Sequence, residues 1–144
     1  MTTSVDWAAI GSNLAAKFGN VDGIVSASYP APNELGLTPA IVLFPPSATL
    51  EEAPALDWYT SRWPATLYVE RTSDFAPPLQ AMDPLIGSIY DAFHDGKVLG
   101  LSGVVQNCRI VSHEIDHLPQ YDGAYIGCRF EVEVQVIVPV ARTA

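Results

Sequence analysis

The chain is short of cysteine, of positive charge and of long apolar runs. Its two cysteines, Cys108 and Cys128, are too few for a disulfide framework, and neither belongs to a C-x-x-C pair. The seven lysines and arginines are scattered and are outnumbered by 16 acidic residues, which gives a net charge of −9. Nucleic-acid binding through counterion release needs clustered basic side chains, so the composition argues against sequence-specific DNA binding.

Signals for export or membrane insertion are also missing. No segment approaches the roughly 20 apolar residues of a membrane helix. The N-terminal segment lacks the basic start and apolar run of a signal peptide, and no N-x-S/T acceptor occurs. We therefore expect a cytosolic protein with reduced thiols and no membrane contact. Its 144 residues predict a single domain, 1–144.

Two segments have helical periodicity. The first begins with Ser4 as the expected N-cap and Asp6 in its first turn, and it ends near Gly19. The second spans 73–96, where Pro84 predicts either a kink or the true start of the helix. Each segment carries an apolar stripe at spacings of three and four, which predicts packing on a sheet. The stripes are Trp7, Ile10, Leu14 and Phe18, and then Leu79, Met82, Ile86, Ile89 and Phe93.

The remaining apolar segments indicate strands. Alternation is clearest in 125–138, where valines alternate with Glu131, Glu133 and Gln135. This segment and 103–115 predict a long C-terminal β-hairpin with its turn at Asp122-Gly123. Further strands are expected in 24–29, 39–46 and 64–71.

The order α-β-β-β-α-β-β has no regular β-α-β alternation. We therefore predict an α+β fold, with a mostly antiparallel sheet and both helices on one face.

Residues 47–63 show no clean period and are predicted to form a long loop. Such a loop inside a compact domain is usually functional or mobile. It contains an acidic pair and three large aromatic residues that predict a contact, either with the parent domain or with a neighbouring subunit. The predicted contact residues are Glu51, Glu52, Trp58, Tyr59 and Trp63.

The stretch 113-HEIDH-117 matches the H-E-x-x-H pattern of zinc peptidases. In those enzymes an α-helix places the two histidines one turn apart, so that both reach one metal. Here the β-branched residues upstream and Pro119 downstream favour a strand, in which His113 and His117 would lie about 13 Å apart. The sequence therefore predicts no metal site. A zinc hydrolase using His113, Glu114 and His117 is the less favoured alternative.

Other catalytic patterns are incomplete. The glycine-rich stretch 96–103 lacks G-K-[ST], and no G-x-S-x-G elbow occurs. A Cys108–His113 or Cys128–His117 dyad is formally open, but a cysteine among apolar neighbours in a strand favours a buried, inert thiol. We predict no catalytic residue and no cofactor, and expect the protein not to be an enzyme.

The layout resembles a known family of structural proteins. An N-terminal helix leads to 29-YPAPNELGLTPAIVLFPP-46, followed by a strand, the helix within 79–96, and a closing hairpin. This order, and the phrase from Tyr121 to Val134, resemble the tail terminator proteins of long non-contractile-tailed phages, also called minor tail or tail-completion proteins. The family has no catalytic motif, so no residue roles follow from the resemblance.

The resemblance implies a hexameric ring that caps the tail tube. Its implied partners are further copies of the chain, the tail tube protein and the head-completion protein, with the genome passing through the ring unbound. The implied location is the head-proximal end of the virion tail, after assembly in the host cytoplasm. A head-to-tail connector of the same virion is the alternative within this class. An adaptor that binds another protein through Trp58, Tyr59 and Trp63 is a further one.

Overall fold

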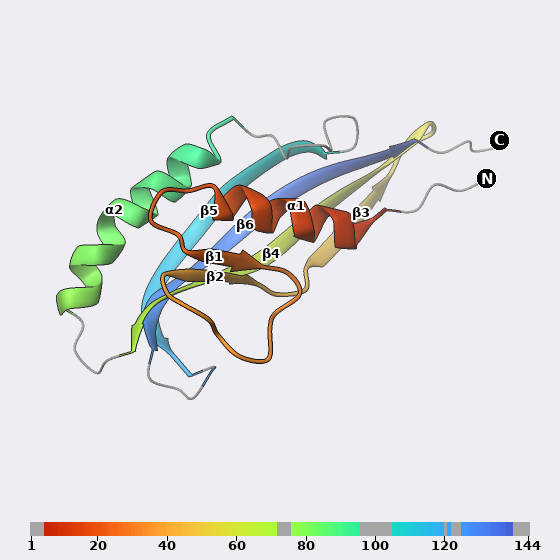
Figure 1. Ribbon diagram of the computed structural model, residues 1–144. Helices are drawn as coiled ribbons and strands as arrows, with labels where there is room; N and C mark the ends of the chain where they lie inside the picture. The colour runs from red at the N-terminus through yellow and green to blue at the C-terminus, as the bar shows by residue number, and fades with distance from the viewer. Residues whose placement is uncertain (1–4, 72–75, 96–104, 120, 122–124, 140–144) are drawn as a thin grey trace.

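A long, twisted sheet with two helices packed against it forms the fold (Figure 1). The computed structural model describes residues 5–71, 76–95, 105–119, 121 and 125–139. The helices within these residues are α1 (Trp7–Gly19) and α2 (Ala76–Ala92). The strands are β1 (Ser26–Ser28), β2 (Ala40–Leu43), β3 (Ser47–Glu52), β4 (Leu56–Arg71), β5 (Val105–Leu118) and β6 (Tyr125–Pro139).

The predicted α+β class and the order of the elements are confirmed, and β3 is an additional strand. The prediction of a loop over 47–63 is wrong. These residues form β3 and the first half of β4, which pair as an antiparallel hairpin from Ser47↔Arg62 to Glu52↔Asp57. Every β3 side chain is exposed, so the strand has no apolar face that periodicity could detect.

The sheet has the order β1-β2-β4-β6-β5, and β3 pairs with β4 beyond the end of β2. Only β1 and β2 are parallel; β5 and β6 form the predicted C-terminal hairpin. The predicted turn at Asp122-Gly123 lies outside the described residues. The long strands β4 and β6 stay paired as far as Leu56↔Pro139, so together with β3 they project past both helices (Figure 1).

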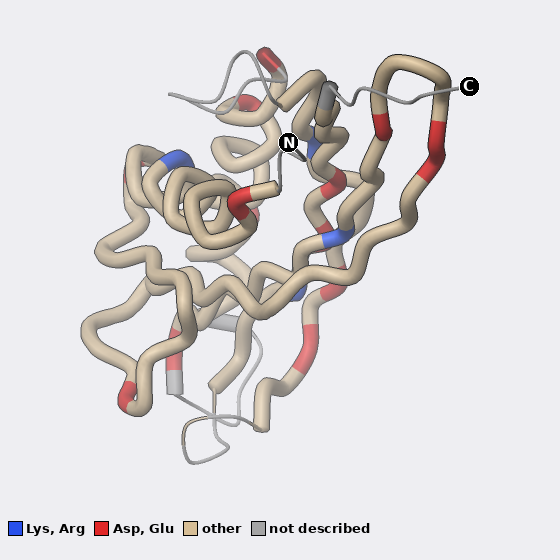
Figure 2. The backbone as a smooth tube through the Cα atoms, turned by 90° about the vertical axis from the view of Figure 1, so that its right-hand side faces the viewer, with Lys and Arg blue, Asp and Glu red and all other residues tan. Residues whose placement is uncertain are grey.

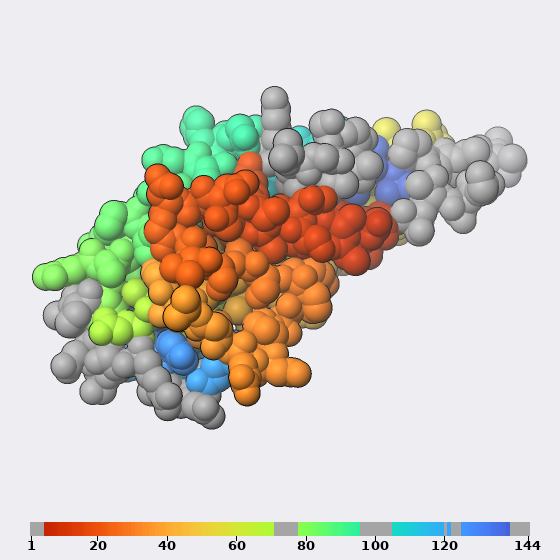
Figure 3. Space-filling model, viewed as in Figure 1, coloured from red at the N-terminus to blue at the C-terminus, as the bar shows by residue number. Residues whose placement is uncertain are grey.

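Both helices cover one side of the sheet, here called the helix face. Alternate residues of β4 and β6 point toward the helices and are almost all buried, as their period of two requires. Helix α1 crosses the front of the molecule over β1 and β2, while α2 lies over β4 and β6 (Figures 1 and 3). The largest fully buried side chains of this core are Trp63, Phe18, Ile10, Leu14, Ile41, Leu43, Leu67, Met82, Ile89 and Ile126.

The opposite side of the sheet, here called the outer face, is mostly polar. A small second cluster of Val42, Tyr68 and Leu118 lies at one end of it. The hydroxyl of Tyr121 donates to the carbonyl oxygen of Pro32 over 2.8 Å, which ties the loop before β2 to the end of the β5–β6 hairpin. This loop therefore closes one end of the outer face.

Proline positions explain how β2 and β3 share one edge of β4. Pro64 lies inside β4, where its missing N–H would ordinarily break the ladder. The N–H and C=O groups of one strand residue point to the same side. Because the Pro64 carbonyl accepts from the Phe44 N–H at 2.9 Å, the missing N–H of Pro64 would face the same edge, at the Pro45-Pro46 break between β2 and β3. The absent donor thus coincides with a point where the neighbouring strand is itself interrupted.

The helix ends differ in detail from the predictions. Asp6 is the N-cap of α1, and its carboxylate accepts from the Ala9 N–H at 3.0 Å; Ser4 lies outside the described residues. The second helix begins at Ala76, so Pro84 lies inside it and does not mark its start. Pro77 and Pro78 occupy its first turn, where a backbone donor is not needed.

Candidate functional site

The HEIDH segment lies entirely in β5, as predicted. His113 is opposite Phe130 and His117 is opposite Ile126, so the two histidines share the helix face at positions about 13 Å apart along the strand. Glu114 points to the outer face, because successive side chains alternate. The segment therefore does not bring two imidazoles and a carboxylate together. No cluster of metal-ligating side chains occurs within the described ranges.

His113 is held by α2. The Tyr90 hydroxyl and His113 Nδ1 are hydrogen-bonded at 2.7 Å, and the ring of Phe130 lies beneath both side chains, at 6.1 Å from His113 and 6.4 Å from Tyr90. Burial raises the pKa of Tyr90 above its usual value, which keeps the hydroxyl protonated. The pair fixes the position of α2 over the edge of the sheet and leaves His113 Nε2 directed away from the bond.

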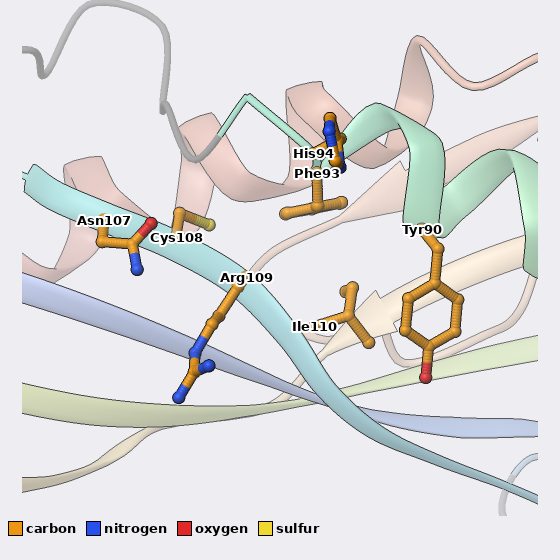
Figure 4. Close-up of a pocket in the computed structure, with 7 residues that line it drawn as sticks. All are labelled: Tyr90, Phe93, His94, Asn107, Cys108, Arg109 and Ile110. Carbon is orange, nitrogen blue, oxygen red and sulfur yellow. The ribbon is translucent and has the colours of Figure 1, made fainter.

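A cavity of about 300 Å³ lies between the end of α2 and β5 (Figure 4). Tyr90, Phe93 and His94 line it from the helix side, and Arg109 extends away from α2 on the strand side. The thiol of Cys108 also faces this region, but burial raises its pKa to about 12. The cavity therefore contains no activated nucleophile. The two candidate Cys–His dyads are not formed either. Cys128 lies opposite Ile115 and not His117, and Cys108 and His113 lie five residues apart along β5.

Both thiols should be unreactive in the native protein. Burial raises the pKa of Cys108 and of Cys128 to about 12, so at pH 8 only about one thiol in ten thousand is ionised. We expect no labelling by a thiol-specific disulfide reagent in native buffer and two equivalents on unfolding in guanidinium. Rapid native labelling of either cysteine would contradict this. Because these pKa values are raised from 9, their contribution to stability is complete below pH 9 and is lost as the pH rises toward 12.

The outer face carries a network of ion pairs that periodicity alone did not reveal. Glu133 alternates with the buried valines of β6 as Glu131 does, but its side chain is only 7% exposed. Arg62 Nη2 lies 2.8 Å from one of its oxygens and Arg109 Nη2 lies 3.3 Å from the other. Arg62 also approaches Glu131 at 3.5 Å. Two guanidinium groups on a largely buried carboxylate fix β4, β5 and β6 in register.

The predicted contact residues separate into two groups. Glu51 and Glu52 are exposed on β3, near the tip of the projecting hairpin, where acidic residues lie on both strands (Figure 2). Trp58 is opposite Glu51 on the outer face and is half-buried. Tyr59 and Trp63 point to the helix face, where the ring of Tyr59 meets that of Trp7 edge to face at 5.7 Å. Trp63 is 0% exposed, so it belongs to the core and not to a contact surface.

Two features of the surface were not apparent in the sequence. The described strands leave edges at β1 and β3 on one side of the sheet and at β5 on the other, and an exposed apolar side chain lies beside both β3 and β5. Among the described residues the large exposed apolar side chains are Val25, Leu37, Leu50 and Tyr90. Leu50 lies on β3, and Tyr90 lies against β5 through His113. Only the strand pairing shows which segments are the edges.

No protein-family model matches the chain, and no curated protein sequence is significantly similar to it. No helix within the described part of the chain is long and apolar enough to cross a membrane. The fold and its surfaces define an α+β protein with a projecting acidic hairpin and a polar, ion-paired outer face.

Proposed function

We propose that the chain is a structural tail terminator of a long-tailed phage, which forms a ring at the end of the tail tube and joins it to the head-completion protein. It acts by assembly and not by catalytic turnover. The observation that carries the proposal is the projecting ribbon of β3, β4 and β6, which extends past both helices and exposes every side chain of β3. An isolated monomer gains nothing from such a projection, whereas a ring subunit can use it to contact a partner.

The charge of the hairpin supports the same role. Glu51, Glu52 and Asp57 lie together near its tip, and Glu52 pairs directly with Asp57 across the strands. Like charges opposite each other destabilise a hairpin slightly, so their placement favours a function outside the monomer. With a net charge of −9 per chain, a ring of copies repels DNA phosphates and lets the genome pass without binding.

Capping of tail tubes tests the proposal. Tubes assembled from the tail tube protein of the same phage are mixed with the purified chain and imaged by negative-stain electron microscopy. We expect ring-shaped density at one end of each tube and an arrest of further tube growth. Tubes that continue to grow uncapped at saturating protein would overturn the proposal. Binding to the portal-side connector without any effect on tubes would instead support the connector alternative.

A charge reversal on the hairpin should weaken capping. The double variant Glu51→Lys/Glu52→Lys is expected to need roughly tenfold more protein for half-maximal capping, because rim charges set the encounter rate and orientation. Asp83→Lys/Asp91→Lys is the matched control, since both aspartates are exposed on α2, away from the hairpin. Equal loss in both variants would show that net charge, and not the hairpin, determines capping.

A further inference from the structure

We infer that β3 of one copy pairs with the edge of β5 that no described strand covers in a second copy, head to tail, so that the sheet continues across the subunit boundary. The inference rests on the proposed function in one respect: it names the surfaces through which the ring would form. Free strand edges are usually shortened, bulged or blocked in monomers because they promote association. The six-residue β3 contains no proline, no lysine and no bulge.

The backbone of β3 has a defined outward edge. The N–H of Ala53 donates to the carbonyl of Leu56 at 2.9 Å, which makes Ala53 and Leu56 a hydrogen-bonded pair. Hydrogen-bonded and non-bonded pairs alternate in an antiparallel ladder. The N–H and C=O groups of Ala48, Leu50 and Glu52 therefore point away from β4.

The edge of β5 presents a complementary stretch. Register shifts lie at Val105/Asn107 and Ile110/Ser112, and the strand is regular from Ser112 to Leu118. The alternation of hydrogen-bonded and non-bonded pairs continues from the β3–β4 pair through β4–β6 to β5–β6. It directs the backbone N–H and C=O groups of His113, Ile115 and His117 away from β6. The N–H of His117 accordingly donates to the carboxylate of Asp116 at 2.8 Å and not to β6. The stretch available for pairing is centred on His113 and Ile115.

The strand directions of β3 and β5, and the side of the sheet on which their side chains lie, both allow the two edges to pair. Within one subunit β3 and β5 run in opposite directions, because β3 is antiparallel to β4, β4 to β6, and β6 to β5. Copies related by rotation about an axis that runs roughly along the strands would therefore bring them together antiparallel. The outward residues of both strands also carry their side chains on the helix face, so the helix face of one copy would continue into that of the next.

One register matches the side chains on that face. It sets Leu50 opposite Ile115, Ala48 opposite His117 and Glu52 opposite His113. Leu50, 43% exposed in the monomer, would then be covered, and Tyr90, 36% exposed, would lie at the border of the contact. On the outer face the same register places Glu51 opposite Glu114, a like-charge pair that weakens the contact.

The contact is head to tail, so it joins two different edges and can be tested by mixing. Leu50→Pro removes an outward donor without touching the β3–β4 ladder, and Leu50→Thr is its control with the donor intact. His113→Pro and His113→Thr form the same pair on β5. We expect each proline variant to weaken self-association roughly tenfold or more, measured by light scattering after size exclusion, with the threonine variants closer to wild type. Circular dichroism checks that each variant is folded.

Mixing the two proline variants gives the sharper result. Each variant keeps one intact edge, so an equimolar mixture should form dimers and stop there. Hydrogen exchange of the wild-type assembly should show protection at 47–52 and 112–118 relative to the monomer. Assemblies of normal size from Leu50→Pro alone, or a mixture that forms no dimer, would overturn the pairing while tube capping remained a separate result.

The like-charge pair provides a variant that should gain affinity. Glu114→Lys replaces repulsion by attraction opposite Glu51 and is expected to strengthen self-association about threefold to tenfold, an effect that high salt should reduce. This variant does not depend on tolerance of proline. Unchanged or weaker association would overturn the register. A wild-type chain that stays monomeric at every concentration, alone and on tubes, would overturn the pairing itself; capping by monomers would leave the proposed function standing.

Discussion

Replacing Trp63 with alanine should lower the free energy of unfolding by about 4 kcal/mol, because the indole is fully buried between α1 and the sheet. Its ring packs against Trp7 at 6.5 Å and Tyr29 at 5.4 Å. Its Nε1–H donates to Ser61 Oγ at 3.0 Å, and that hydroxyl donates to the carbonyl of Val134. For a chain of this size the loss corresponds to a melting temperature lower by roughly 10 °C.

Two companion variants separate the possible causes. Trp63→Phe keeps most of the apolar contact and leaves the Ser61 hydroxyl bonded to Val134, so it should cost about 1–2 kcal/mol. Trp58→Ala removes a half-buried ring from the outer face and should cost about 1 kcal/mol. Thermal and urea unfolding measure all three. A folded, equally stable Trp63→Ala protein that loses only a binding partner would instead restore the contact role predicted from the sequence.

Gly127→Ala should destabilise the protein by about 3 kcal/mol or more, or prevent folding. Gly127 lies in β6 opposite Tyr68, where a Cβ would overlap the carbonyl oxygen of Leu67 and lie 2.7 Å from Leu118 Cδ1. The carbonyl belongs to the central strand β4 and cannot move without breaking its ladder. A soluble Gly127→Ala protein with unchanged urea midpoint would show that the two strands can separate locally.

Gly87→Ala is the matched control for that substitution. Gly87 lies on the exposed side of α2, and a Cβ there would meet no atom within 4 Å. Alanine loses less conformational entropy than glycine on forming a helix, so this variant should be more stable by up to about 1 kcal/mol. The opposite signs expected at the two glycines would show that local space, and not glycine content, decides the effect.

Strong periodicity was a reliable guide to this fold. The stripe of Trp7, Ile10, Leu14 and Phe18 correctly predicted α1, and three of these side chains are almost completely buried. The alternating valines gave β6, and the β-branched residues before HEIDH placed it on a strand. In each case one buried face imposes a regular spacing on the sequence, so the spacing can be read without the structure.

The hairpin of β3 and β4 could not be found in this way. All six residues of β3 are exposed, and the first half of β4 alternates aromatic and polar residues on both faces. Neither pattern has the period that burial creates. Local spacing has the same limit at Glu133. It placed this side chain on the face opposite the buried valines, but it could not show that arginines from two other strands surround the carboxylate.

The sequence by itself determined the α+β class, the order of the predicted elements and the extended backbone that separates His113 from His117. These follow from local spacing, because each element must bury one side of itself. Only the tertiary structure decided that Trp63 is core, that β3 and β5 lie at edges of the sheet, and which side chains meet across the outer face. Those features depend on which strands pair, and pairing joins residues far apart in the chain through contacts that no local pattern records.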